Sequence, residues 1–542
     1  MKVHFVLTGY LPELFGGAEV YTQNLAKALQ ARGHEVGVIT LDLKHKRGYA
    51  TDEPFEGVPV HRLGFLFEFR PPALYALQFY AEMYDEATAY FQRTRPDVVH
   101  VANSWFVPAI AFAALHLGIP VVGTHVDYLW TCRDSHLLKK DHEACGVSPD
   151  VDCRGCNTDL TDTQWPLAHR FRREQFALLA QGYAFHHCPC PLLGEHIRSL
   201  GADPRKVEVW PYGIPPRARV SKTTSDVLRL GFIGRWNRMK GIHVLLEAME
   251  MIGADARVRL TLYGEQEVWN NDTYGAEQAE RAKRLANVHI AGRFNQQELA
   301  EVHREIDVLV TPSIWPENSP VSMLEALALG TPCLCADGAG MTNLVEPETN
   351  GLVFRSRDAR DLAEKIKQLA AAPELVRKLQ AGAKLLRTIE EDAEKFERVY
   401  AVANPANDPA WRSASTRFVD TVRLAAEVLA PSALSTKWRE KTGQLLAAGV
   451  RRIALFGAGR HTLRLLDAVT VPQGLELVAI FDENPDACGG KILGAPVRPL
   501  SEAASIKPDA VIVSSDAWEK QMLAKAAFLR EHGIVVTGLY GE

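Results

Sequence analysis

The sequence predicts an α/β fold made of doubly wound, mostly parallel sheets. Short apolar runs alternate with segments of helical period, which is the pattern of strand–helix–strand units. Glycine-containing turns follow several of these runs, where sheets of this type bind their ligands. At 542 residues the chain is too long for one hydrophobic core, so roughly three or four units are expected.

The first unit is expected over residues 1–216. It opens with a strand at 2–8, a loop of glycine and proline, a helix at 18–33 and a second strand at 34–40. Further strands are expected at 96–102, 119–125 and 206–213. Residues 98–126 contain no Asp, Glu, Lys or Arg, but His, Asn and Pro residues interrupt the run. Strand, helix and strand therefore explain it better than a membrane span.

A second unit is expected over residues 227–402, after a polar linker at 217–226. Its pattern is a strand at 228–234, a helix at 241–252, strands at 258–264 and 307–313, a helix that carries Glu325, and a strand at 331–337. Two α/β halves of this kind enclose a ligand cleft at the carboxyl ends of their strands.

The remaining sequence predicts a linker and helices over residues 403–448, with the linker at 403–415, and a Rossmann-like domain over 449–542. In the domain, "RRIALFGAGRHTLRLLDAV" reads as strand, glycine turn and helix, and the next strand ends at Asp482. Gly457 and Gly459 occupy the turn, and Thr462 stands where a third glycine is common. This pattern is compatible with NAD or another nucleotide, with an active dehydrogenase, or with a module that only mediates assembly.

Charge and composition exclude several classes of partner. With 47% hydrophobic and 23% charged residues the chain is an ordinary globular protein, and a net charge of -5 gives no general reason to bind nucleic acid. The first residues lack the long apolar run of a signal peptide, so a cytoplasmic protein is expected, with the inner face of the membrane as an alternative. The nine cysteines are then thiols or metal ligands rather than disulfides.

The segment "WPENSPVSMLEALALG" predicts an anion site at the start of a helix. Ser319 suits the N-cap and Pro320 the first helical position, so the free amides and the positive end of the helix dipole are available to a phosphate. Glu325 lies within reach of a ribose beside that phosphate, and Glu317 lies where an attached sugar would be. The alternative is that both acids are solvated, one on a loop and one on the helix surface.

Two basic residues strengthen the anion-site interpretation. In "GFIGRWNRMKGIHVLLEAM" a strand runs into a glycine turn that presents Arg235 and Lys240 just before a helix. Two fixed cations stabilise a leaving nucleoside diphosphate without a metal. The alternative is that both are loop cations facing water.

At this point the sequence resembles glycosyltransferase family 4, the retaining enzymes of GT-B fold. The resemblance rests on "FGGAEVY", on "GRWNRMKG", on Glu317 and Glu325 separated by seven residues within "NSPVSMLEALALGTP", and on "NGLVF". It covers roughly residues 1–402. It implies transfer from a nucleotide sugar, with the acceptor attacking from the face that the diphosphate leaves and with no separate general base.

The resemblance also implies roles for individual residues. Arg235 and Lys240 would hold the donor diphosphate, Glu317 the donor sugar and Glu325 the ribose, while amides around Ser319, Pro320 and Val321 would contact sugar and phosphate. Gly16 and Gly17 would let the N-terminal loop approach the diphosphate. The family usually has His followed by Asp on the acceptor side. Here Val126 separates His125 from Asp127, so both are site candidates, with a structural role at a strand end as the alternative.

A cysteine-rich insertion is expected at residues 130–160. Cys132, Cys145, Cys153 and Cys156 lie in a polar stretch, and the last two have the spacing of tetrahedral metal ligands. This favours a structural zinc site, in which His136 or His142 can replace one thiolate. Free thiols and a redox pair are the alternatives, and Cys188 and Cys190 are expected to be packing residues.

The sequence therefore predicts a nucleotide-sugar-dependent retaining glycosyltransferase whose catalytic site needs no metal. A carbohydrate, lipid-linked or small-molecule acceptor is expected, and polysaccharide biosynthesis is one setting. The alternatives are a nicotinamide-dependent sugar oxidoreductase acting through the C-terminal domain, and a catalytically silent nucleotide-sugar-binding protein. The aromatic stretch at residues 65–84 is expected to be a packed helix pair, with docking of an acceptor or peripheral contact with a membrane as alternatives.

Overall fold

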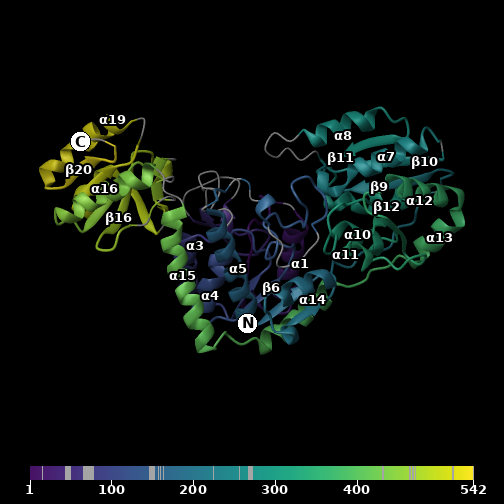
Figure 1. Cartoon of the computed structure of the whole chain (residues 1–542), viewed down its shortest axis with the longest axis horizontal. Helices are drawn as coiled ribbons and strands as arrows, with labels where there is room; N and C mark the ends of the chain where they lie inside the picture. Colours follow the sequence, from purple (N-terminus) through teal and green to yellow (C-terminus); the bar gives the residue numbers. More distant parts are fainter. Residues whose placement is uncertain are drawn as a thin grey trace.

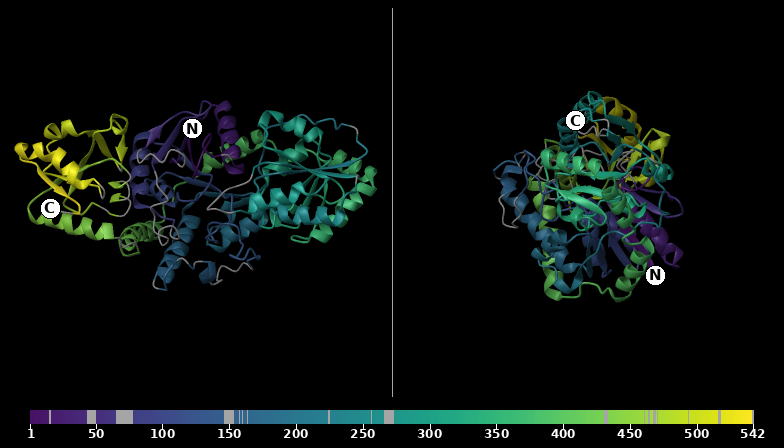
Figure 2. Two further views of the ribbon diagram at one scale, coloured as in Figure 1. Left: turned by 90° about the horizontal axis from the view of Figure 1, so that it is seen from above. Right: turned by 90° about the vertical axis from the view of Figure 1, so that its right-hand side faces the viewer.

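Three α/β units lie in a row (Figure 1). The computed structural model describes residues 1–14, 16–42, 50–64, 78–145, 153–156, 158, 160–162, 164–223, 225–255, 257–265, 273–429, 433–459, 461–462, 465–466, 469, 471–492, 494–515 and 518–540. The first unit is in the middle, with the second on one side and the C-terminal unit on the other, and the row is also evident from above (Figure 2). The expected doubly wound architecture is confirmed.

The first unit is built on an eight-stranded sheet in the order β3-β4-β2-β1-β5-β6-β7-β8. Its strands are β1 (Lys2–Val6), β2 (Glu35–Asp42), β3 (Thr51–Asp52), β4 (Val60–Gly64), β5 (Val98–Val101), β6 (Val121–Thr124), β7 (Phe185–Cys188) and β8 (Val207–Val209). Its helices are α1 (Gly17–Ala31), α3 (Ala81–Thr94), α4 (Pro108–His116), α5 (Gln164–Gly182) and α6 (Pro191–Ser199). All neighbouring strands are parallel except β3 and β4. Chain order reverses between β1 and β5, which is where such a sheet opens a ligand crevice.

The apolar run at residues 98–126 forms β5, α4 and β6, as expected, and all three are buried. Among the described residues, no helix has the length and apolar character needed to cross a bilayer. Of the aromatic stretch, residues 65–77 lie outside the described part, while Phe79, Tyr80 and Met83 are buried in the first unit.

The second unit has a six-stranded, wholly parallel sheet in the order β11-β10-β9-β12-β13-β14. Its strands are β9 (Leu228–Ile233), β10 (Val258–Tyr263), β11 (Val288–Gly292), β12 (Val308–Thr311), β13 (Cys333–Ala336) and β14 (Gly351–Phe354). Its helices are α7 (Ile242–Ile252), α8 (Tyr274–Lys283), α9 (Leu299–Arg304), α10 (Val321–Ala328), α11 (Ala339–Thr342), α12 (Ala359–Ala371) and α13 (Pro373–Gly382). Chain order reverses between β9 and β12. The Arg235–Lys240 turn follows β9 and the Glu317 loop follows β12, so both motifs meet at this switch point.

The end of the second unit differs from the expected boundary at residue 402. Helix α14 (Ile389–Val402) returns to the first unit and packs on α1. Its fully buried Asp392 accepts hydrogen bonds from Tyr21 Oη at 2.7 Å, Trp210 Nε1 at 2.9 Å and the Gly213 amide at 2.7 Å. Asp392 needs these donors because an unpaired buried carboxylate is costly, so the helix is fixed to the first unit.

The expected linker at 403–415 is shorter than the sequence suggests. Helix α15 (Pro409–Leu429) begins inside it and packs along the first unit against α5 and α4. Trp411 and Phe418 are buried there, and Trp411 Nε1 donates to the Leu178 carbonyl at 2.8 Å. The linker was predicted to be too long because the polar segment "NPANDP" directly precedes the apolar face of this helix.

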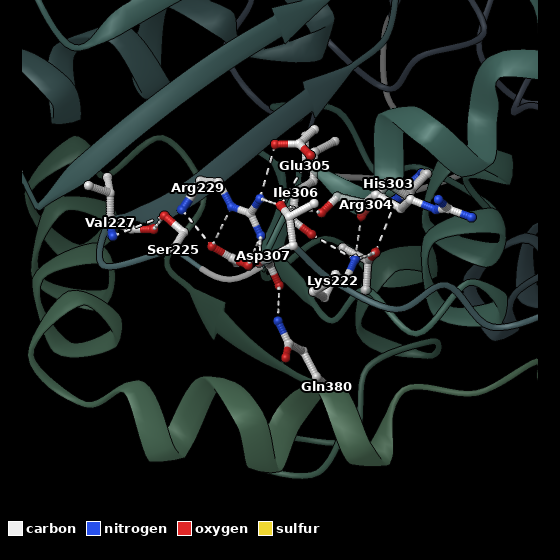
Figure 3. A network of polar contacts seen from close by, with 12 residues as sticks. Lys222, Ser225, Val227, Arg229, His303, Arg304, Glu305, Ile306, Asp307 and Gln380 are labelled. Carbon is white, nitrogen blue, oxygen red and sulfur yellow. Dashed lines mark hydrogen bonds and ion pairs between the residues drawn. The ribbon is translucent and has the colours of Figure 1, made fainter.

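The linker at 217–226 is fastened to the second unit rather than free (Figure 3). Lys222 Nζ donates to the carbonyls of His303 at 2.6 Å and Ile306 at 2.7 Å and to Thr331 Oγ1 at 2.5 Å. At the start of β9, Arg229 pairs with Asp307 at 2.7 Å. Residues that look like a solvated tether in the sequence therefore form a polar seam along the base of the second unit.

The C-terminal unit has a third sheet in the order β17-β18-β16-β15-β19-β20, joined to the first unit through α15 and α16 (Ala433–Ala447). Its strands are β15 (Arg452–Phe456), β16 (Glu476–Asp482), β17 (Lys491–Ile492), β18 (Ala495–Pro499), β19 (Ala510–Val513) and β20 (Val535–Gly538). Its shorter helices include α18 (Ala503–Ile506) and α19 (Glu519–Ala526). Asp482 ends β16, as the sequence predicts.

Candidate active site

Glu317 and Lys240 meet where the first and second units face one another. Glu317 is 5% exposed, and its Oε1 accepts hydrogen bonds from Lys240 Nζ at 2.6 Å and from Ser313 Oγ at 2.7 Å. Lys240 ends the short helix Arg238–Lys240, whose first turn is capped by the side chain of Asn237. Glu317 is therefore not a solvated loop acid. Of the two cations, Lys240 is half-buried and paired with Glu317, whereas Arg235 is exposed.

Gly340 supports the Glu317 loop, although no motif in the sequence singles it out. Its amide donates to the Glu317 carbonyl at 2.8 Å. A Cβ at this position would lie 1.9 Å from the Asn318 carbonyl oxygen and 2.1 Å from that of Glu317. Only glycine lets α11 approach the loop this closely.

Helix α10 begins one residue later than the sequence predicts. Pro320 is the N-cap, with φ -60° and ψ 114°, and Val321 is the first helical residue. Ser319 is therefore not the cap; its Oγ accepts a hydrogen bond from the Tyr212 amide of the first unit at 3.3 Å. The extended ψ of Pro320 excludes it from the helix. The first intrahelical bond is donated by Met323, so the amides of Val321 and Ser322 precede it at the positive end of α10.

The glycine loop of the first unit reaches the start of this helix. A Cβ on Gly17 would lie 3.3 Å from Val321 Cγ2, and one on Gly16 would lie 2.4 Å from a carboxylate oxygen of Glu19. Burial raises the pKa of Glu19 to about 7, and nearby Arg235 opposes the rise. Arg235 is thus close to the glycine loop, on the same side of the second unit as Val321.

Glu325 lies inside a polar cluster rather than on a solvated helix face. It is 9% exposed, and its Oε1 accepts from Arg217 Nη2 at 3.3 Å and from Gln296 Nε2 at 2.5 Å. Burial raises the pKa of Glu325, while Arg217 and Gln296 lower it. Both partners were missed from the sequence: Arg217 reads as a linker residue and Gln296 as a loop amide.

His125 and Asp127 have different surroundings. His125 is buried within the first unit, where its Nε2 lies 3.0 Å from His186 Nδ1, and burial lowers its pKa well below the usual value. Asp127 accepts from Trp105 Nε1 at 2.7 Å and from the Leu129 amide at 2.8 Å, and burial raises its pKa to about 6. The residue between them contacts the site, because the Val126 carbonyl accepts from Asn318 Nδ2. The structure brings this segment, but not the His125 ring, to Glu317.

The four cysteines of the insertion lie near one another. Burial raises the pKa of Cys153 to about 11, and the other three thiols add to the rise. Among the described residues, however, no three His, Cys, Asp or Glu side chains are arranged to hold a metal ion. The tetrahedral set expected from the spacing is therefore not assembled. Cys188 and Cys190 are fully buried, as expected for packing residues.

His136, expected as a substitute metal ligand, lies at the Glu317 site instead. Its ring meets the Trp315 indole edge-on, with centroids 5.1 Å apart. Glu317, Lys240 and Arg235 all act on its pKa, which burial lowers to about 4. His136 therefore links Arg235, Lys240 and Glu317 to one place in the interface between the two units.

The glycine turn of the C-terminal unit has internal partners for its polar groups. Gly457 has φ +109°, and the Ala458 amide donates to Asp482 Oδ2 at 2.5 Å. Asp482 Oδ1 accepts from the Asn484 amide at 2.8 Å. In a dinucleotide site the turn amides face a pyrophosphate and the acid faces a ribose. Here one of those amides bonds to that acid.

Two family models match adjacent parts of the chain. The model described as glycosyl transferases group 1 matches residues 218–385, and that of a glycosyl transferase 4-like domain matches residues 16–213. A D-inositol 3-phosphate glycosyltransferase of Segniliparus rotundus is 26% identical over 67% of this chain and 78% of its own. A glycogen synthase of Mycobacterium tuberculosis is 24% identical over 69% of this chain and 87% of its own.

Solved structures resemble the first two units in fold. The crystal structure of Anabaena Alr3699/HepE in complex with UDP and glucose aligns with TM-score 0.52 and 16% identity, covering 74% of this chain and all of that one. Sucrose-phosphate synthase (tll1590) from Thermosynechococcus elongatus aligns with TM-score 0.52 and 18% identity, covering 78% and 98%. The expected GT-B arrangement of two facing domains is confirmed.

Proposed function

This chain belongs to the group 1 glycosyltransferases, and we propose that it moves a sugar from a nucleoside diphosphate to an acceptor hydroxyl with retention of configuration. The acceptor is a glycan, a lipid-linked carrier or a small molecule, reached in the cytoplasm or at the inner face of the membrane. One observation carries the proposal: the pair that half-buried Lys240 forms with buried Glu317 beside the start of α10, with Arg235 close by.

Arg235, Lys240 and the first amides of α10 are assigned to the diphosphate. Lys240 has three N–H donors, so it reaches a phosphate oxygen while one proton still bonds Glu317. Lys240 and the helix amides are held in place before the substrate arrives and stabilise charge that develops on the leaving group, where losing one such donor costs ~10²–10³ in kcat. Side-chain and backbone donors thus supply the positive charge that a metal supplies in other transferases.

Glu317 is assigned to the donor sugar and Glu325 to the ribose. The bond from the sugar carbon to the diphosphate oxygen breaks, and the acceptor oxygen attacks from the same face through an oxocarbenium-like state. The acceptor proton passes to the departing diphosphate. Gly16 and Gly17 leave room for the diphosphate beside Val321, because larger residues there would meet Glu19 and Val321.

The test is Glu317→Gln, which keeps the shape of the side chain and its bond from Ser313 but removes the charge. We expect transfer to fall by ~10²-fold or more while a nucleoside diphosphate binds with little change. Nucleotide sugars with different bases are first screened by thermal stabilisation, and products of the stabilising donor are then analysed. Unchanged transfer in the variant contradicts the role given to Glu317.

The alternative of a nicotinamide-dependent oxidoreductase is not favoured, because the matched families lie within residues 16–385 and leave out 449–542. For the C-terminal unit we propose a nucleotide-binding or assembly role. A change in nicotinamide absorbance with substrate, lost on changing Gly457, is the result that would instead support a dehydrogenase.

Zinc at Cys132, Cys145, Cys153 and Cys156 stays a prediction. The thiols are close in space, but the described residues do not present the converging ligands that a structural zinc requires. Elemental analysis of the purified protein decides it: one zinc per chain, lost when Cys153 and Cys156 are replaced by Ser, supports the site.

A further inference from the structure

The cysteine-rich insertion places an imidazole in the proposed active site. His136 comes from the first unit, between β6 and α5, whereas Trp315 precedes Glu317 by two residues in the second unit. The two rings meet at 75°, and Lys240 Nζ lies 5.8 Å from the centroid of the same indole. The Trp315 indole therefore lies beside the His136 imidazole and the Lys240 ammonium. The Glu317 carboxylate joins this group through its 2.6 Å bond to that ammonium.

Contacts on both sides fix this position. Within the insertion, residues 137–145 fold into a hairpin in which Leu138 pairs with Ala144 and the Cys145 amide donates to the Leu137 carbonyl at 2.9 Å. Across the interface, Arg357 of the second unit donates to the His142 carbonyl and to the Ile314 carbonyl, the latter at 3.3 Å. The hairpin is thus held against the loop that leads to Trp315 and Glu317.

The chemical state of the ring follows from these surroundings. Burial lowers the pKa of His136 to about 4; Lys240 and Arg235 add to the lowering, and Glu317 opposes it. The imidazole is therefore neutral at neutral pH. A neutral imidazole has one N–H donor and one acceptor nitrogen, so the ring keeps an acceptor for a ligand.

An acceptor beside Arg235 and Lys240 suits a hydroxyl better than a phosphate. A nitrogen lone pair repels a phosphate oxygen, which the two cations attract, but it accepts an O–H readily. Trp315 adds a donor: its indole N–H is buried and has no hydrogen-bond partner in the described part of the chain. A polyhydroxylated group beside both rings would receive one bond and give another.

We propose that His136 is a further substrate-contacting residue, whose unprotonated ring nitrogen accepts a hydrogen bond from a sugar hydroxyl at the reaction centre. The cysteine-rich insertion then forms one wall of the active site and is not only a structural appendage. The hydroxyl belongs either to the transferred sugar or to the acceptor, which offer the same chemistry. This inference rests on the function proposed above and adds a residue to its site.

The experiment compares His136→Phe, His136→Asn and Lys139→Ala. Phe keeps an aromatic ring against Trp315 but has no acceptor, Asn restores an acceptor, and Lys139 is an exposed residue of the same hairpin. Calorimetry measures the affinity for UDP, GDP and ADP, thermal melting reports folding, and turnover of the donor found by the stabilisation screen is followed with and without acceptor.

We expect His136→Phe to lower kcat by ~10- to 100-fold, because one neutral hydrogen bond to the substrate is lost, with nucleoside diphosphate affinity and melting unchanged. Asn recovers part of the loss and Lys139→Ala behaves as wild type. If donor hydrolysis without acceptor falls equally, the hydroxyl is on the transferred sugar; if only transfer falls, it is on the acceptor. Full activity in His136→Phe overturns the inference, whereas a wild-type protein that binds none of the nucleotides overturns the proposed function itself.

Discussion

Arg217 offers the sharpest test of how the interdomain linker takes part in donor binding. Its Nη2 lies 3.3 Å from Glu325 Oε1, and the two side chains are 24% and 11% exposed. At that separation and an effective dielectric constant of ~20, two unit charges attract by ~5 kcal/mol. Water screens part of this attraction and desolvation offsets another part, so we take ~2 kcal/mol as the net loss in Arg217→Met.

The variant is expected to bind the nucleoside diphosphate about 30-fold more weakly at neutral pH, since 1.4 kcal/mol is a factor of ten in affinity. The pH dependence of this affinity is also expected to shift, in a direction set by the pKa of Glu325. Arg217 lowers the pKa of Glu325, so its removal raises that pKa further. The ionised Glu325 carboxylate, which we propose accepts from the ribose, is then lost at a higher pH as the solution is acidified, and the fall in affinity shifts toward neutral pH.

Calorimetric titration with the nucleoside diphosphate between pH 5 and 9 measures both effects. Arg217→Lys keeps the charge and should recover most of the affinity. Arg219→Met is the matched control, because Arg219 lies two residues along the same linker and bonds the Ala383 and Gln380 carbonyls instead of Glu325. If Arg217→Met keeps the wild-type affinity and pH profile, Arg217 does not position Glu325 for the ribose.

Three further predictions concern stability and are measured by urea unfolding. Asp392→Asn should lower the free energy of unfolding by ~2–4 kcal/mol. The reason is that the new amide group would face N–H and O–H donors that now bond to the buried carboxylate, namely those of Tyr21, Trp210 and Gly213. A loss under 1 kcal/mol would mean that α14 is held mainly by its apolar face. Gly340→Ala should cost ~1–3 kcal/mol and reduce transfer, since its Cβ would displace the carbonyls of Glu317 and Asn318. The control is Gly443→Ala, which should not lower stability, because Gly443 has no positive φ and its Cβ would meet no atom within 4 Å. Asp127→Asn should flatten the pH dependence of stability between about pH 4 and 6: the folded pKa of about 6 exceeds the unfolded value of ~3.9, so the folded state binds more protons there and loses stability as pH rises. The variant should therefore be spared the loss of ~2 kcal/mol that this carboxyl causes in the wild type between pH 4 and pH 7, and an unchanged slope would contradict the burial of that carboxylate.

The order of helices and strands could be predicted from the sequence, because each of them depends on a local pattern of residues. The charge-free run at residues 98–126 became β5, α4 and β6, and Asp482 ended β16. The start of α10 was misjudged by one residue, because whether Pro320 is cap or first helical residue depends on its ψ, which contacts outside the helix decide. The predicted end of the second unit at residue 402 was wrong for a related reason. Helix α14 has an apolar face that could cover either unit, and only Asp392 and its donors show that it covers the first.

The candidate site residues divide in the same way, into those that a local pattern predicts and those that it does not. Glu317, Lys240 and Glu325 could be proposed from the sequence because residue type and spacing along one chain segment indicate them, and the family match supports a glycosyltransferase. His136 and Arg217 were missed because neither belongs to a local pattern: one looked like a metal ligand of the insertion, the other like a solvated linker residue. Each reaches its partner from a segment more than a hundred residues away.

By itself, the sequence determined that this protein has paired α/β units, an appended third unit, and the acids and cations of a glycosyltransferase, because periodicity and motif spacing are properties of neighbouring residues. The tertiary structure alone decided what surrounds those acids: a lysine and a serine on Glu317, an arginine from the linker on Glu325, and a neutral histidine from the insertion beside Trp315. The physical reason is that the burial of a side chain and the electrostatic field on it depend on all the residues around it in space. Around these acids, most of those residues are distant along the chain.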